Sequence, residues 1–201
     1  MFEYSRLKNV VPNVTINGAR MTNELYDDLV HYCGAVAVSM YDPKDVCYNA
    51  VQELTNRGMK QVNIHKMLCR ETYHECEQVL RDRLTDPRLK DMHAIVFLMM
   101  KPKGKRNIYH TLDSTSDFKK LVEFALENEI KIGFDSCSAP TFLKAVVDHP
   151  RIKTFQMLAE PCESSLFSSY INVDGRYCHC SFTEGVEPWK GIDVLNCKDF
   201  L

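Results

Sequence analysis

The sequence predicts an α/β fold, in which a parallel sheet with helices is followed by a small cysteine-containing β-hairpin domain. Two observations support this prediction. Short apolar runs alternate with amphipathic segments over the first two thirds of the chain, which is the pattern of repeated βαβ units. After about residue 150, loops, one hairpin signal and closely spaced cysteines replace that alternation. We therefore expect two domains, 1–150 and 151–201.

The first predicted strand is Val11–Ile16, which ends at the turn pair Asn17-Gly18. Thr22 then follows as the N-cap of a helix that reaches about Tyr32. The next strand is Ala35–Met40, a continuous apolar run of the kind that is buried on both faces of a sheet. This opening strand–helix–strand order is the first βαβ unit.

The next helix and strand follow in the same order. Asp42-Pro43 predicts a helix start, with the aspartate as N-cap and the proline in the first helical position. That helix should stop at Gly58, and Gln61–Leu68 is the third strand. Thr72-Tyr73-His74-Glu75 matches a capping box, which predicts a helix through about Leu84.

The last part of the sheet and the hairpin complete the prediction. Met92–Met100 and Ile130–Phe134 are apolar strands, and the intervening helix is capped in the region Ser114–Asp117. Pro140 suits the first turn of the following helix. Beyond residue 150, Asp174-Gly175 is a two-residue hairpin signal between the runs 169–173 and 176–182.

Ligands of parallel sheets bind beyond the carboxyl ends of the strands, so the residues at those ends are the first candidates for a site. They are Asn17, Ser39, Lys66, Lys101 and the stretch 135–137. His65 could face the same opening, although a single strand histidine is more often structural.

Composition limits the class of protein. The chain has 201 residues, a net charge of −2 and 45% hydrophobic residues, which is typical of a globular protein. No apolar run is long enough to cross a membrane and the N-terminus lacks signal-peptide features, so we expect a cytoplasmic protein without a membrane partner. The run Lys101–Arg106 carries four cations, but the near-neutral whole argues against a nucleic-acid partner.

Nine cysteines call for an explanation in a compartment where thiols stay reduced. The first four fall in or beside helical patterns and should be buried apolar side chains. In contrast, Cys137 follows the last strand, Cys162 precedes the hairpin, and Cys180 lies on its returning arm. Three thiolates that converge in this way suit zinc or an iron–sulfur cluster, and residue type alone does not choose between them.

Several motifs, taken in order, resemble radical S-adenosylmethionine (SAM) enzymes with a SPASM- or twitch-type C-terminal domain. The spacing Cys-x12-Gly-x4-Cys from Cys162 to Cys180 looks like the opening signature of that domain. The segments NVTING, ending in Asn17-Gly18, and VAVS, ending at Ser39, resemble the third and fourth strands of the family, and the segment after Lys101 resembles a Pro-x-Gly segment that follows a late strand.

The resemblance implies a partial (β/α) barrel and an auxiliary 4Fe–4S cluster on Cys137, Cys162 and Cys180. It also implies SAM near Asn17 and Ser39, an electron-donor protein, and a small-molecule or peptide substrate. Enzymes of this family reduce SAM to a 5′-deoxyadenosyl radical, which abstracts a hydrogen atom from the substrate.

The chain departs from the family pattern at both ends. No three cysteines have the spacing Cys-x3-Cys-x2-Cys of the loop that holds the SAM-cleaving cluster. We therefore expect a fragment that starts near the third strand and is inactive alone. Cys178, Cys197 or a residue further downstream could be the fourth ligand of the auxiliary cluster. The alternative from a different class is a non-enzymatic scaffold whose cysteines hold zinc.

Overall fold

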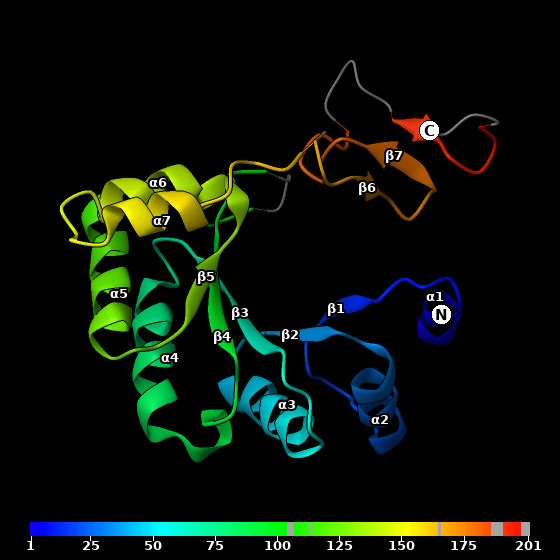
Figure 1. Ribbon diagram of the computed structural model, residues 1–201, viewed down its shortest axis with the longest axis horizontal. Helices are drawn as coiled ribbons and strands as arrows, with labels where there is room; N and C mark the ends of the chain where they lie inside the picture. Colours follow the sequence, from blue (N-terminus) through cyan, green and yellow to red (C-terminus); the bar gives the residue numbers. More distant parts are fainter. Residues whose placement is uncertain (104–106, 113, 165, 186–190, 198–201) are drawn as a thin grey trace.

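A five-stranded parallel sheet with helices on one face forms the larger part of the molecule (Figure 1). The computed structural model describes residues 1–103, 107–112, 114–164, 166–185 and 191–197. The strands are β1 (Asn13–Ile16), β2 (Ala35–Ser39), β3 (Val62–Leu68), β4 (Ala94–Met99) and β5 (Ile132–Phe134). They pair in that order, and every pair is parallel. The predicted α/β class with a partial barrel is confirmed.

The strand order explains why the helices lie together. Each strand pairs with the next one along the chain, and right-handed crossovers of this kind place every connecting helix on the same face. The main helices are α2 (Asn23–Tyr32), α3 (Lys44–Asn56), α4 (Tyr73–Thr85), α5 (Thr115–Glu127), α6 (Ala139–Ala145) and α7 (Ile152–Leu158). Short segments add α1 (Phe2–Leu7), η1 (Pro87–Leu89) and η2 (Ser136–Ser138).

The core lies between the helices and the sheet face that they cover. On β3 burial alternates residue by residue, with Val62, Ile64, Lys66 and Leu68 buried and Asn63, His65 and Met67 half-buried. The half-buried set therefore faces the concave side, as period-2 alternation requires. Leucines and valines of α2 to α5 complete the core, and α7 joins it through Phe155, whose ring lies 5.5 Å from that of Phe142 on α6.

Helix caps show where local sequence decides the structure. Thr22 accepts a hydrogen bond from the Leu25 N–H at 3.2 Å, and the Ser114 hydroxyl accepts one from the Ser116 N–H at 3.0 Å, so both predicted caps are confirmed. The proline prediction was off by one residue. Pro43 is itself the N-cap of α3, in an extended conformation, and Asp42 makes no cap.

The predicted capping box at Thr72 was wrong. Its hydroxyl donates to the Met67 carbonyl at 2.6 Å, and α4 has no side-chain cap. Glu75, the expected second half of the box, instead forms an ion pair with the buried Lys66 of β3. A tertiary contact therefore displaced the local one.

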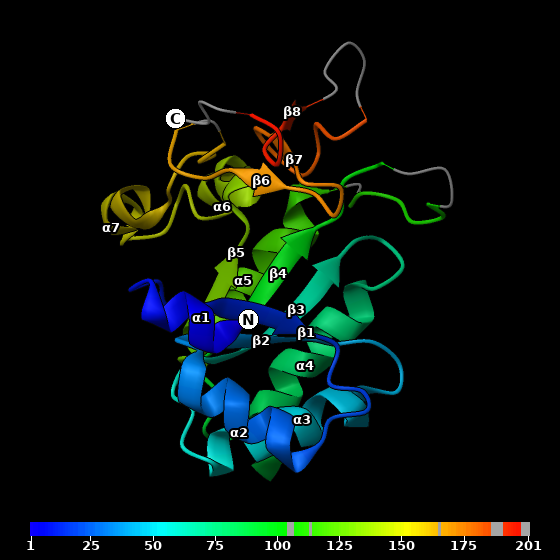
Figure 2. The same ribbon diagram turned by 90° about the vertical axis from the view of Figure 1, so that its right-hand side faces the viewer.

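A small three-stranded antiparallel sheet follows the parallel one, with β6 (Tyr170–Ile171), β7 (Arg176–Cys178) and β8 (Ile192–Asp193). Figure 2 shows β3 and β4 pointing toward it, so the small sheet lies over the carboxyl ends of the strands. Among the described residues beyond Ala159 only Cys178 is buried. This unit therefore has almost no core of its own and depends on other contacts.

The hairpin is confirmed, but its loop is longer than predicted. Asn172 pairs with Arg176, which leaves three loop residues, 173–175. The Asn172 side chain accepts hydrogen bonds from the N–H groups of Asp174 and Arg176, and Gly175 adopts φ +72°. A three-residue loop with glycine in the left-handed position is a common hairpin form. The asparagine turn decided the loop length here.

Candidate functional site

Two cavities lie at the carboxyl ends of the strands, beneath and beside the small sheet. The first, which we call the cysteine cavity, has a volume of about 290 Å³. It is lined by Cys137 of η2, Cys162 of the loop after α7 and Cys180 of the segment after β7. The structure thus brings together the three cysteines that the sequence singled out, from segments up to 43 positions apart along the chain.

The thiols that line the cysteine cavity are accessible. Cys137 and Cys162 are exposed and Cys180 is half-buried, whereas Cys33, Cys47, Cys69 and Cys76 are buried as predicted. All nine cysteines are free thiols. Burial raises the pKa of the buried Cys47 and Cys76 thiols to about 12, so they are poor thiolate donors.

The environment of Cys137 contains two opposing charges. Partial burial raises the pKa of its thiol, the Lys101 ammonium lowers it, and Asp135 raises it again, as does a hydrogen bond with the Cys162 thiol. Three thiols around one cavity are a donor set that suits iron–sulfur clusters or zinc. As the side chains stand, no group of three or more His, Cys, Asp and Glu residues in the described part of the chain is arranged to hold a metal ion.

His179 also lines the cysteine cavity, and the sequence analysis did not single it out. Its ring packs edge-on against Tyr177 at 5.7 Å, and its backbone carbonyl accepts a hydrogen bond from the Ser164 hydroxyl at 2.9 Å. The triplet Cys-His-Cys at 178–180 was the available signal. Of the three alternatives for a fourth ligand, the two within this chain, Cys178 and Cys197, are not among the described residues that line this cavity. Cys178 is 2% exposed and lies within β7.

The second cavity, which we call the strand-end cavity, is larger, at about 770 Å³. Ser39 and His65 line it as neighbours in register on β2 and β3. Asn17 is not among its described lining residues. The Asn17 side chain accepts a hydrogen bond from the Ala19 N–H at 3.0 Å, which is the turn-forming role that asparagine often has.

Asp135 and Phe182 line both cavities and form the wall between them. The Asp135 carboxylate forms an ion pair with Lys101 and accepts hydrogen bonds from the Ser138 hydroxyl and from the Met99 N–H, the latter at 3.1 Å. The Lys101 ammonium lies 5.0 Å from the centre of the Phe182 ring. The sequence analysis named Asp135 only as part of the candidate stretch 135–137 at a strand end. The structure gives it these three partners.

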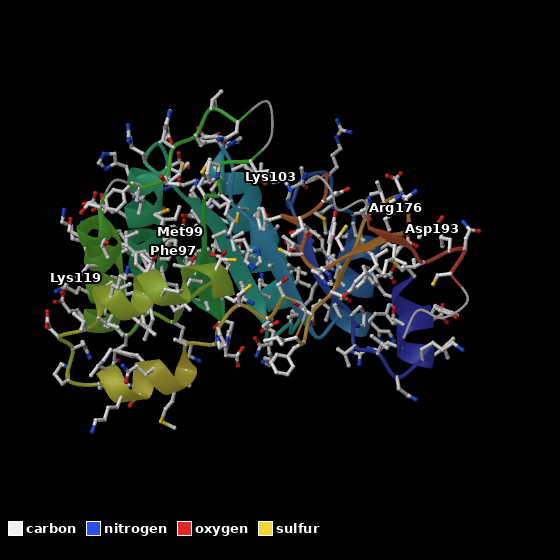
Figure 3. The ribbon with its side chains drawn as sticks, turned by 90° about the horizontal axis from the view of Figure 1, so that it is seen from above. Phe97, Met99, Lys103, Lys119, Arg176 and Asp193 are labelled. Atoms are coloured by element: carbon white, nitrogen blue, oxygen red, sulfur yellow. The ribbon has the colours of Figure 1, made fainter. Side chains whose placement is uncertain are left out.

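Lys103 connects β4 to the small sheet. Its ammonium donates hydrogen bonds to the backbone carbonyls of Phe182 at 2.5 Å and Glu184 at 2.8 Å. Figure 3, seen from above, shows Lys119 on the opposite side of the molecule from Arg176 and Asp193 of the small sheet. In the basic run 101–106, Lys101 and Lys103 are thus engaged within the protein, and residues 104–106 lie outside the described part of the chain.

Comparison with known proteins identifies a fold. SuiB of Streptococcus suis has a similar structure, with a TM-score of 0.71 over 98% of this chain and 49% of SuiB, at 11% sequence identity. The chain therefore spans about half the length of SuiB. No family model and no curated protein sequence matches the chain. At this identity the likeness shows the fold alone. None of the described helices is long and apolar enough to cross a membrane.

Proposed function

We propose that this chain belongs to a radical SAM enzyme and carries its auxiliary 4Fe–4S cluster. The observation that carries the proposal is the gathering of Cys137, Cys162 and Cys180 around one cavity at the strand ends. The fold similarity to SuiB supports it, because partial barrels followed by a small antiparallel unit are what the resemblance implies. Cys137, Cys162 and Cys180 would supply three thiolate ligands.

A cluster in this place would also explain how the small sheet is stabilised. That unit has a single buried residue in its described part, and metal ligation commonly replaces a missing core in small domains. When bound, an auxiliary cluster accepts an electron or positions the substrate. Lys101 would offset part of the negative charge of the thiolates, since its ammonium already acts on Cys137. Ser39 would contact SAM from the strand-end cavity. For Asn17, which caps its own turn, the corresponding role remains an expectation.

Anaerobic reconstitution with iron and sulfide tests the proposal. We expect about four irons and four sulfides per chain. Cys137→Ser, Cys162→Ser and Cys180→Ser should each lower both, whereas Cys33→Ala, which removes a buried thiol of the core, should lower neither. One zinc per chain without sulfide would contradict the proposal and favour the zinc scaffold.

SAM cleavage separates this chain from an intact enzyme. No three cysteines here have the spacing Cys-x3-Cys-x2-Cys. The 201-residue chain should therefore bind iron and sulfide without cleaving SAM under reducing conditions. Formation of 5′-deoxyadenosine by this chain would show that the assignment of its cysteines is wrong.

A further inference from the structure

The strand-end cavity has the size and position of a small-molecule site. It opens at the ends of β2, β3, β4 and β5 and reaches the small sheet at Phe182. Its volume of about 770 Å³ lies within the range of about 300–1,000 Å³ typical of ligand pockets. The carboxyl ends of parallel strands are where such pockets occur. What remains to be inferred is the chemistry of the molecule it takes.

The walls of the cavity are mainly apolar and rich in methionine. Four of the nine methionines line it, together with leucine and aromatic side chains. The four are Met40, Met67, Met99 and Met100. Methionine is flexible and polarisable, so a wall of this kind adapts to apolar ligands, aromatic rings in particular.

Each lysine in the wall already has a partner within the protein. Lys66 forms an ion pair with Glu75, and Lys101 forms one with Asp135. Lys103 donates to two backbone carbonyls. Three lysines and three carboxylates, the third being Asp42, line the described part of the cavity. An anionic ligand would have to compete with these partners for each ammonium group, so the wall does not favour one.

Two polar side chains lie together on the concave face. Ser39 and His65 are opposite each other in the β2–β3 register, and neither side chain has a hydrogen bond to a described residue. Burial lowers the pKa of His65, which keeps its imidazole neutral at pH 7 with one donor and one acceptor nitrogen. An unpaired imidazole in an apolar cavity is suited to one directional hydrogen bond.

We propose that the strand-end cavity, beside the SAM that Ser39 would contact, binds a second molecule or side chain that is uncharged, mainly apolar and bears one hydroxyl or amide group, and that His65 hydrogen-bonds that group. The inference rests on the proposed function, in that this molecule would be the substrate of that enzyme. His65 is then a specificity-determining residue, because it selects the polar group of the ligand. A phenol-bearing or alcohol-bearing group meets these requirements.

Methyl NMR of methionine provides a direct test. The probes are p-cresol, p-xylene, which replaces the hydroxyl by a methyl group, and 4-methylbenzoate, an anion of similar shape. In the chain labelled with ¹³C at the methionine methyls, p-cresol should shift the signals of the four cavity methionines in a saturable way. Met157, which is 85% exposed on α7, should not move. 4-Methylbenzoate should bind at least tenfold more weakly than p-cresol.

Variants at His65 test its role. His65→Phe should weaken p-cresol about tenfold, the typical worth of one hydrogen bond, and leave p-xylene unchanged. His65→Gln, which keeps a donor and an acceptor, should restore most of the loss, and His31→Phe on the far helix α2 is the matched control. The signals of Met59 and Met92, which are buried away from the cavity, verify that each variant is folded.

Distinct results overturn distinct parts of the argument. Equal or tighter binding of 4-methylbenzoate would refute the uncharged class, and p-cresol shifts confined to methionines outside the cavity would refute the site. An unchanged p-cresol affinity in His65→Phe would refute the role of His65. Iron and sulfide measured on the same sample keep the two proposals separate, because p-cresol binding without a cluster contradicts only the proposed function.

Discussion

Replacing Glu75 by glutamine tests whether the buried ammonium of Lys66 needs its carboxylate. Lys66 is 3% exposed on the helix-facing side of β3, and its ammonium also donates to the Met40 carbonyl at 3.4 Å. Removing one partner of a fully buried ion pair costs about 3–5 kcal/mol. The Glu75 side chain is 48% exposed, so water reaches the pair and reduces that cost. We expect Glu75→Gln to lower the free energy of unfolding by about 2 kcal/mol.

Urea unfolding with a double-mutant cycle measures this effect. Glu77→Gln is the control, because Glu77 lies on the same helix and pairs with the exposed His74. It should change the free energy of unfolding by at most about 0.5 kcal/mol. The double variant Lys66→Met with Glu75→Gln removes both charges and should lie within about 1 kcal/mol of the parent. Two outcomes would refute the reasoning. One is an equal loss of unfolding free energy in Glu75→Gln and Glu77→Gln. The other is a double variant whose loss equals the sum of the losses in Lys66→Met alone and Glu75→Gln alone.

Three further predictions concern other contacts. Gly18→Ala should lower the free energy of unfolding by about 1–3 kcal/mol in urea titrations, because Gly18 has φ +74° and an added Cβ would meet the Ala50 side chain at 3.0 Å. An unchanged urea midpoint of unfolding would contradict this. Lys103→Met should make the segment after residue 159 more sensitive to limited proteolysis, while Lys119→Met on α5 should leave it unchanged. Hydrogen bonds from the backbone N–H and the ring of His110 hold the pKa of the Glu71 carboxyl at about 2, below its ordinary 4.5. The contribution of Glu71 to stability is therefore present above about pH 4.5 and is lost as the pH falls toward 2. Carboxyl NMR titration checks that pKa, and a midpoint near 4.5 would exclude the contact.

The sheet could be predicted because its strands carry their signal locally. In the run Ala35–Met40 the central residues Val36, Ala37 and Val38 are apolar and buried, and caps such as Thr22 act within three residues. Predictions failed where a distant group competes for a local one. The Thr72 box matched its pattern, but Lys66 took Glu75, and no sequence window shows that competition.

The candidate site divides in the same way. Cys162 and Cys180 could be selected because their spacing around a glycine is a sequence pattern, and Cys137 because it follows a strand. The place of His65 in the cavity, where no described residue hydrogen-bonds its side chain, and the position of His179 beside the thiols depend on register and burial. Neither property can be read from the residue type, since a single strand histidine is more often part of a packed core.

The shared wall between the two cavities links the two proposals physically. Asp135 is held by Lys101 and by the Met99 N–H at the end of β4, and Phe182 is held by Lys103 and lies over Lys101. A molecule in the strand-end cavity would contact the same two side chains that face the cysteines on the other side. Any shift of the Lys101 ammonium on ligand binding would therefore change the electrostatic field at Cys137, because that ammonium already lowers the pKa of its thiol. The coupling runs through one charge and one ring, so Lys101→Met should remove it without altering the residues that line the rest of either cavity.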